Sequence, residues 1–137
     1  MLAVDTNVLV RFFTRDDSRQ AARAASLMRS GEVWVAKTVL LETEWVLRSL
    51  CGFAPESVIA ALRGLGGLSN IHLEDPLAVA KALDWFSHSL EFTDALHLAS
   101  SGEAERFATF DGKFSRAAKR LSSVEVEVVA VLSPASW

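Results

Sequence analysis

The stretch Leu2-Ala3-Val4-Asp5-Thr6-Asn7 decides the fold class of this chain. Three apolar residues stop at an acid, and residues that begin helices follow, which is typical of a short buried strand feeding directly into a helix. In an open parallel sheet, ligands bind beyond the carboxyl ends of the strands. Asp5 therefore lies at the carboxyl end of a predicted strand, where ligand-binding side chains are expected. Capping of the following helix is the structural alternative, although Thr6 and Asn7 are capping types too.

The same alternation of apolar runs and helical patterns continues along the chain. Further short strands are expected at 33–36, 71–73, 106–110 and 126–132, with helical segments between them. Short, nearly continuous apolar strands between helices are typical of a parallel sheet covered on both faces. We therefore predict an α/β fold with a mostly parallel sheet of roughly five strands. Residues 1–132 are expected to form one domain and 133–137 a short tail.

Composition excludes several classes of protein. Half of the 137 residues are hydrophobic and 23% are charged, so the chain is not a disordered tail. The single cysteine, Cys51, excludes an internal disulfide and fits a reducing compartment. No apolar run reaches the length of a membrane span, and the N-terminus lacks the features of a secretory signal. We expect a cytoplasmic protein.

Charge is unevenly distributed. The net charge of −3 argues against a protein that coats nucleic acid by bulk charge. The first thirty residues nevertheless hold five Arg against three Asp, and residues 111–120 hold four basic residues against Asp111 alone. The candidates for contacts with RNA phosphates are Arg11, Arg15, Lys113 and Arg116, with solvated helix faces as an equal alternative.

Four acids stand where predicted strands end or predicted helices begin: Asp5, Glu42, Asp94 and Asp111. Asp111 precedes Gly112, and this pair also resembles a hairpin turn. The helical spacing of Ser115–Leu121 favours a strand-to-helix turn instead. Asp94 lies in the first turn of a helix capped by Thr93, where it also complements the helix dipole.

Glu42 is tested by helical geometry. At about 100° per residue, Glu42 falls between Trp45 and Val46 on an apolar arc, whereas Glu44 and Arg48 share a narrow polar side as an ordinary solvated pair. A carboxylate that faces the core is costly unless it is paired or binds a metal. Glu42 is therefore a functional candidate, with a salt bridge to a distant Arg as the alternative. Tryptophans 34, 45 and 85 are expected in the core.

Several carboxylates around one crevice repel one another strongly, at about 4 kcal/mol for a pair 4 Å apart. Either their pKa values rise or a divalent cation neutralises them. Ligand sets made only of oxygen favour Mg²⁺ or Mn²⁺ over zinc. Such ions can activate a water for attack on a phosphodiester.

Four segments carry a resemblance to a known family: Val4–Val10, Leu41–Leu47, Phe92–Ala99 and Ala108–Asp111. Their order and spacing resemble the PIN domain, and within it the VapC-type toxins of bacterial toxin–antitoxin pairs. The resemblance implies a single-domain, PIN-like three-layer sandwich. It places the family's four acids on Asp5, Glu42, Asp94 and Asp111, with Asp5 and Asp94 as the principal metal ligands. The supporting polar positions fall on Thr6, Asn7 and Thr109.

The resemblance also implies an activity and partners. The expected protein is a Mg²⁺- or Mn²⁺-dependent endoribonuclease that leaves 5′-phosphate and 3′-hydroxyl ends. It would act on loops of structured cellular RNA such as tRNA or rRNA, form a homodimer and be blocked by a cognate antitoxin.

Two other functions remain open. A non-catalytic PIN-like module would bind RNA or protein with the same fold, because a fold does not determine a function. A phosphatase or phospho-acceptor domain would use Asp5 as nucleophile. That chemistry requires a second Asp two residues on, where this chain has Asn7.

Overall fold

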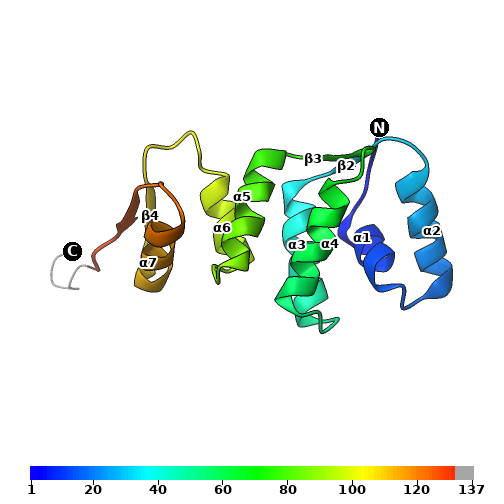
Figure 1. Cartoon of the computed structure of the whole chain (residues 1–137), viewed down its shortest axis with the longest axis horizontal. Coiled ribbons are helices and arrows are strands. Elements are labelled where there is room, and N and C mark those ends of the chain that lie inside the picture. Colours follow the sequence, from blue (N-terminus) through cyan, green and yellow to red (C-terminus); the bar gives the residue numbers. More distant parts are fainter. Residues whose placement is uncertain (132–137) are drawn as a thin grey trace.

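The computed structural model describes residues 1–131, so the predicted tail at 133–137 and the last residue of the predicted 126–132 strand lie outside the described residues. The described part contains helices and strands in the alternating order expected from the sequence (Figure 1). The elements are β1 (Leu2–Ala3), α1 (Thr6–Thr14), α2 (Ser18–Arg29), β2 (Val33–Val35), α3 (Lys37–Ser49), α4 (Pro55–Gly66), β3 (Ile71–Leu73), α5 (Pro76–Ser87), α6 (Phe92–Ala99), β4 (Phe107–Thr109), α7 (Gly112–Leu121) and β5 (Val126–Val128).

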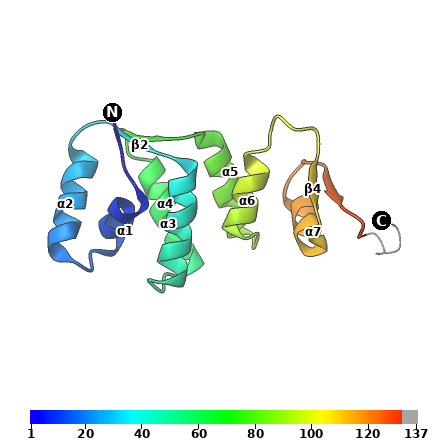
Figure 2. The same cartoon turned by 180° about the vertical axis from the view of Figure 1, so that it is seen from behind.

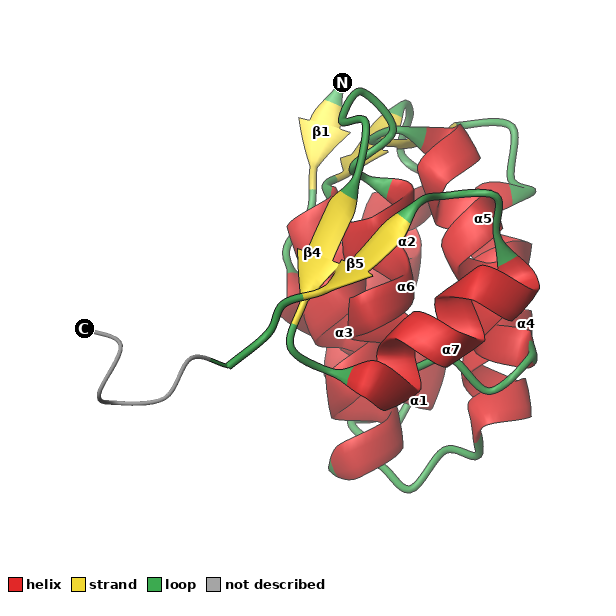
Figure 3. Cartoon of the chain, turned by 90° about the vertical axis from the view of Figure 1, so that its left-hand side faces the viewer, coloured by secondary structure: helices red, strands yellow, loops and turns green. Residues whose placement is uncertain are grey.

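All strand pairs are parallel, which confirms the predicted α/β class. Strand β2 lies between β1 and β3, with Val33 opposite both Leu2 and Ile71. Strand β4 pairs with β5, with Phe107 opposite Val126. The α7 helix that joins these last two strands packs against them (Figure 3).

The expected single sheet of roughly five strands is instead divided into a three-stranded and a two-stranded sheet. Helices α5 and α6 lie between the two sheets in both opposite views (Figures 1 and 2). The division has a simple origin, because hydrophobic alternation along a chain predicts where strands occur and carries no information about which strands pair. Strand β1 is one edge strand of the three-stranded sheet, and β4 is one edge strand of the two-stranded sheet.

The core surrounds the middle strand and the helices that cover it. Val33 and Val35 of β2 are fully buried, as are Leu9 of α1, Leu47 of α3 and Phe92 of α6. Helix α1 packs against α2 and α3, and α5 packs extensively against α6. The C-terminal segment joins the same core cluster through its own apolar residues Phe114, Ala118 and Val126. Among the described residues, no helix is long and apolar enough to cross a membrane.

Aspartates at strand ends begin the helices that follow. Asp5 accepts a hydrogen bond from the Val8 amide at 3.2 Å, and Asp111 accepts one from the Phe114 amide at 3.1 Å. Each satisfies one of the free amide groups of a helix N-terminus. The turn at Asp111-Gly112 therefore leads from a strand into a helix, as predicted, and not into a hairpin.

Lys37 joins three segments at the start of α3. Its ammonium group lies 3.2 Å from Asp75 Oδ2, before α5, and 3.1 Å from Ser100 Oγ, just after α6. Its backbone amide also donates to Glu74 Oε1 at 2.8 Å. The segment that leads from α6 to β4 therefore starts from an anchored residue.

Candidate functional site

The first pair of candidate acids lies where β1 passes into α1. Asp5 is exposed and follows β1 directly, whereas Thr6 is buried. The Thr6 hydroxyl donates a hydrogen bond of 2.5 Å to Glu42 Oε1 on α3. The bond links residues 36 positions apart in the sequence. It places Glu42 of α3 next to the start of α1, beside Asp5.

Helix α3 is turned differently from the prediction. Glu42 is exposed, and it is Glu44 that faces the core, with an exposed fraction of 1%. Glu44 is paired there with Arg48, whose Nε lies 2.6 Å from Glu44 Oε2. This hydrogen bond raises the pKa of Arg48. The predicted core position of Glu42 and the predicted solvated position of Glu44 are both wrong.

The tryptophan on this helix explains the error. Trp45, which is expected in the core, is 51% exposed, so this prediction is wrong. Trp85 is buried, as predicted, and Trp34 is half-buried. Glu42 and Trp45 are both exposed, and Val46 on the same arc is half-buried. The ion pair with Arg48 supplies the partner that a buried Glu44 requires.

The second pair of candidate acids lies near the start of α6 and the end of β4. Asp94 is half-buried in the first turn of α6. Burial raises the pKa of Asp94, and the nearby Asp111 carboxylate raises it further, while His97 opposes the shift. The charges of Asp94 and Asp111 therefore act on each other. Thr109 accepts a hydrogen bond of 3.0 Å from the Asp111 amide and so supports the turn.

The two pairs do not meet in one chain. Within residues 1–131, no group of three or more His, Cys, Asp or Glu side chains is arranged to hold a metal ion. The charged groups that act on the pKa of Asp94 are Asp111, His97 and Glu91. In this arrangement a single copy does not fit the expected metal centre. It divides the four acids into Asp5 with Glu42 and Asp94 with Asp111.

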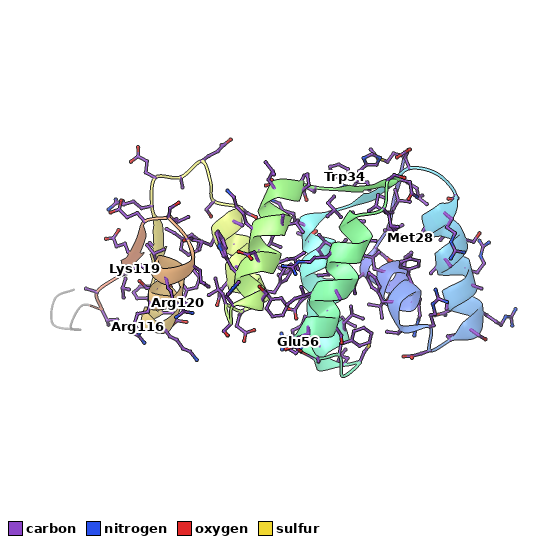
Figure 4. All side chains as sticks on the ribbon, viewed as in Figure 1. Met28, Trp34, Glu56, Arg116, Lys119 and Arg120 are labelled. Carbon is purple, nitrogen blue, oxygen red and sulfur yellow. The ribbon has the colours of Figure 1, made fainter. Side chains whose placement is uncertain are left out.

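The predicted basic residues lie on two separate surfaces. Arg11 lines a cleft of about 470 Å³ between α1 and α2, together with Asn7. Arg15 ends α1 in the left-handed conformation, with φ of 57°. Lys113 and Arg116 are exposed on α7, and Figure 4 shows Arg116 with Lys119 and Arg120 on that helix, at the opposite end of the molecule from Met28 of α2.

Two arginines of the cleft were not among the candidates. Arg19 and Arg23 of α2 line it beside Arg11, and none of the three forms an ion pair with a described residue. Arg19 and Arg23 are four residues apart and so lie on one face of α2. This spacing is the sequence signal that would have identified them. The floor of the cleft is apolar, formed by Val8, Ala24 and Leu27.

Comparison with known proteins gives one family. The sequence model of the PIN domain matches residues 2–120. Among solved structures, the chain is similar to Mycobacterium tuberculosis VapC20, which is described as a Sarcin-Ricin loop cleaving toxin. The identity is 23%, the match covers 85% of this chain and 95% of that one, and the TM-score is 0.44. No curated protein matches the chain.

Proposed function

Because the chain belongs to the PIN domain family, we propose that it is an endoribonuclease of the VapC type that requires Mg²⁺ or Mn²⁺ and acts as the toxin of a toxin–antitoxin pair. The observation that carries the proposal is the family match over residues 2–120, which spans all four candidate acids. Asp5 and Asp111 follow parallel strands directly, and Asp94 lies in the first turn of a helix. These are the places where an α/β fold presents ligand-binding groups.

The chain's own residues prepare the acids for that role. Thr6 holds Glu42 beside Asp5 through a hydrogen bond of 2.5 Å. Thr109 and the amide of Phe114 hold the turn at Asp111. Asp94 and Asp111 repel each other, and a divalent cation relieves such repulsion. When bound, the cation would supply an activated water and stabilise charge on the phosphate.

The activity is tested with the purified chain and with total RNA in the presence of Mg²⁺ or Mn²⁺. We expect cuts that leave 5′-phosphate and 3′-hydroxyl ends. They should fall in exposed loops of tRNA or rRNA, because proteins reach RNA bases most readily where the bases are unstacked. Asp5→Asn should abolish cleavage. Asp16→Asn, at an exposed aspartate outside the site, is the matched control and should cleave normally. Full activity of Asp5→Asn would remove Asp5 from the mechanism.

The arginine cleft supports the proposed binding partner. An antitoxin segment with acidic and apolar side chains fits the three arginines and the apolar floor between α1 and α2. The cleft also begins at Asn7, two residues after Asp5, so an occupant would lie next to the first acid pair. Reversal of Arg19 and Arg23 to Glu should weaken inhibition by the antitoxin and leave the folded structure intact, because α2 is largely exposed on this side.

A non-catalytic binding module is the second candidate, and the divided acid set favours it for an isolated copy. Thermal unfolding with and without millimolar Mn²⁺ distinguishes the two. A ligand that binds only the folded state raises the unfolding temperature. A rise that disappears in Asp94→Asn supports the nuclease, and the absence of any rise supports the binding module.

A further inference from the structure

Phe110 presents an exposed aromatic ring at the turn between β4 and α7. The residue is 70% exposed, and the candidate acid Asp111 follows it directly in the chain. Among the described residues, its ring stacks on no other aromatic ring and does not join the hydrophobic core cluster. A single exposed apolar side chain is ordinary on a protein surface. Its meaning therefore depends on the groups that surround it.

The turn that carries Phe110 is held on both sides. Thr109 Oγ1 accepts a hydrogen bond from the Asp111 amide at 3.0 Å, and Asp111 Oδ1 accepts one from the Phe114 amide at 3.1 Å. The rings of Phe107 and Phe114 lie 5.4 Å apart and hold β4 against α7. The backbone at Phe110 is therefore fixed although its ring faces solvent. A ring held in this way loses little freedom when a ligand stacks on it.

The helix that follows the turn carries only positive charge. Helix α7 contains no acidic residue, and its four basic side chains are all exposed and form no ion pair with a described residue: Lys113, Arg116, Lys119 and Arg120 (Figure 4). Lys119 and Arg120 lie in the last turn, where cations stabilise a helix through its dipole. Lys113 lies in the first turn, where a cation is unfavourable.

Arg116 brings a second cation to the first turn of α7. Its Nη1 atom lies 3.3 Å from the position that a Cβ atom at Gly112 would occupy. The guanidinium group therefore folds back toward the turn that contains Asp111. Lys113 and Arg116 both place positive charge at the end of the helix where it opposes the dipole. Helix stability does not account for these two cations, whereas binding of an anion does.

The ring and the cations together match one nucleotide of a single-stranded RNA. A nucleotide has a flat base and a negative phosphate, and proteins bind single strands by stacking bases on aromatic rings and pairing phosphates with Arg and Lys. An inorganic anion would leave the Phe110 ring unused, and a purely apolar ligand would leave Arg116 unused. The carboxylate of Asp111 repels an acidic peptide, whereas Mg²⁺ commonly bridges carboxylates to substrate phosphates.

We propose that Phe110 is a specificity-determining residue whose ring stacks on an unpaired base beside the scissile phosphate, while Arg116 and Lys113 hold the phosphate of that nucleotide. A base inside a helix has neighbours on both faces and cannot take this place. Because every base has a flat face, the ring selects an unpaired position and tolerates different bases there. The position beside the scissile phosphate rests on the proposed nuclease function, whereas the stacking contact does not.

Binding without cleavage tests the contact. The probe is a fluorescently labelled oligouridine of about ten nucleotides, and its anisotropy is measured in EDTA at fixed salt. Phe110→Leu keeps an apolar side chain but removes the flat ring, so the Kd should rise at least about fivefold. Phe110→Trp should restore binding. Leu77→Ala is the matched control, because Leu77 is 77% exposed on α5, outside the candidate site, and it should bind as the unaltered protein does.

An abasic strand of the same length separates base contacts from phosphate contacts. Phe110→Leu should bind this strand as well as the unaltered protein does. Arg116→Gln should weaken binding of both strands and reduce the dependence of binding on salt. In Phe110→Trp, the fluorescence added by the new indole should be quenched by oligouridine and not by the abasic strand, which reports stacking directly.

Three results would overturn the stacking contact. The first is equal affinity of Phe110→Leu and the unaltered protein for oligouridine, with no quenching in Phe110→Trp. The second is an equal loss of affinity for both strands, since Phe110 would then act through the shape of the turn. The third is the absence of any binding to oligouridine, which would leave the ring to a protein partner.

Cleavage assays separate this contact from the proposed function. Base-dependent binding by a protein that cuts no RNA with Mg²⁺ or Mn²⁺ would support the stacking contact and contradict the nuclease. If the unaltered protein cuts RNA and Phe110→Leu cuts it equally fast at low RNA concentration, the nuclease stands and the role of Phe110 is refuted.

Discussion

Removal of the Arg48 guanidinium should be one of the most destabilising changes on α3. Glu44 is 1% exposed, and the Arg48 Nε at 2.6 Å is the cation that its carboxylate contacts. Arg48→Met keeps most of the apolar stem and leaves a buried carboxylate without its partner. Breaking one side of a buried ion pair costs about 3–5 kcal/mol. Arg48 is itself 33% exposed, so water reaches this end of the pair, and we expect the lower value.

The loss is measured by urea unfolding at constant protein concentration. In a separate thermal unfolding experiment, a loss of about 3 kcal/mol corresponds to a fall in unfolding temperature of about 10 °C for a chain of this length. Fluorescence of the tryptophans reports the transition, because Trp85 is buried and Trp45 is on the same helix as the pair. The free energy of unfolding is compared with that of the unaltered protein.

The matched control replaces both partners. Glu44→Leu with Arg48→Met leaves no unpaired charge, and such apolar replacements of a buried pair are often neutral or stabilising. Most of the stability should therefore return. The reasoning is refuted if Arg48→Met loses less than about 0.5 kcal/mol, which is the range of ordinary surface changes. It is also refuted if the double variant is as unstable as the single one, since the loss would then come from packing of the arginine stem.

Three further predictions concern the candidate acids. Because the folded-state pKa of Asp94 is raised, chiefly by burial, its contribution to stability is complete below the unfolded pKa and is lost as the pH rises through the folded pKa. In metal-free buffer Asp94→Asn should therefore stabilise the protein at neutral pH by less than about 1 kcal/mol and not in strong acid, as measured by unfolding at several pH values. Thr6→Val, which removes the hydrogen bond to Glu42, should cost about 1 kcal/mol and slow RNA cleavage, whereas Thr6→Ser should restore both; equal cleavage by the two variants would contradict a positioning role. Asp111→Asn should abolish cleavage but keep the cap on α7, whereas Asp111→Ala should lose about 1 kcal/mol in addition; equal thermal unfolding of the two would show that the cap contributes nothing.

The sequence predicted the local elements well, because local signals determine them. An apolar run that stops at an aspartate predicted the passage from β1 to α1 and from β4 to α7, and both aspartates cap the helices that follow. The helical spacing after Gly112 correctly outweighed the hairpin signal of Asp111-Gly112. Parallel pairing also followed, because helices separate the strands that pair.

The features that depend on distant contacts were not predictable in this way. The predicted orientation of α3 was wrong, because helical geometry placed Glu42 on an apolar arc with Trp45 and Val46 and that arc was expected to face the core. The Glu44–Arg48 pair stabilises the opposite face in the core and leaves Trp45 half exposed. The division into two sheets depends on where α5 and α6 pack, which no periodicity records. The grouping of the four acids stays a prediction, and within a single chain they lie as two pairs.

The aspartates that follow β1 and β4 have an evolutionary consequence. Because each one also starts a helix, selection for folding acts on these positions even where selection for activity has ended. A descendant that no longer cuts RNA would be expected to drift at positions 5 and 111 toward asparagine or serine, which still accept the amide hydrogen bond, and to avoid alanine. Homologues with such neutral polar residues at both positions would be inactive descendants of an active ancestor, with the architecture of the ancestral site preserved.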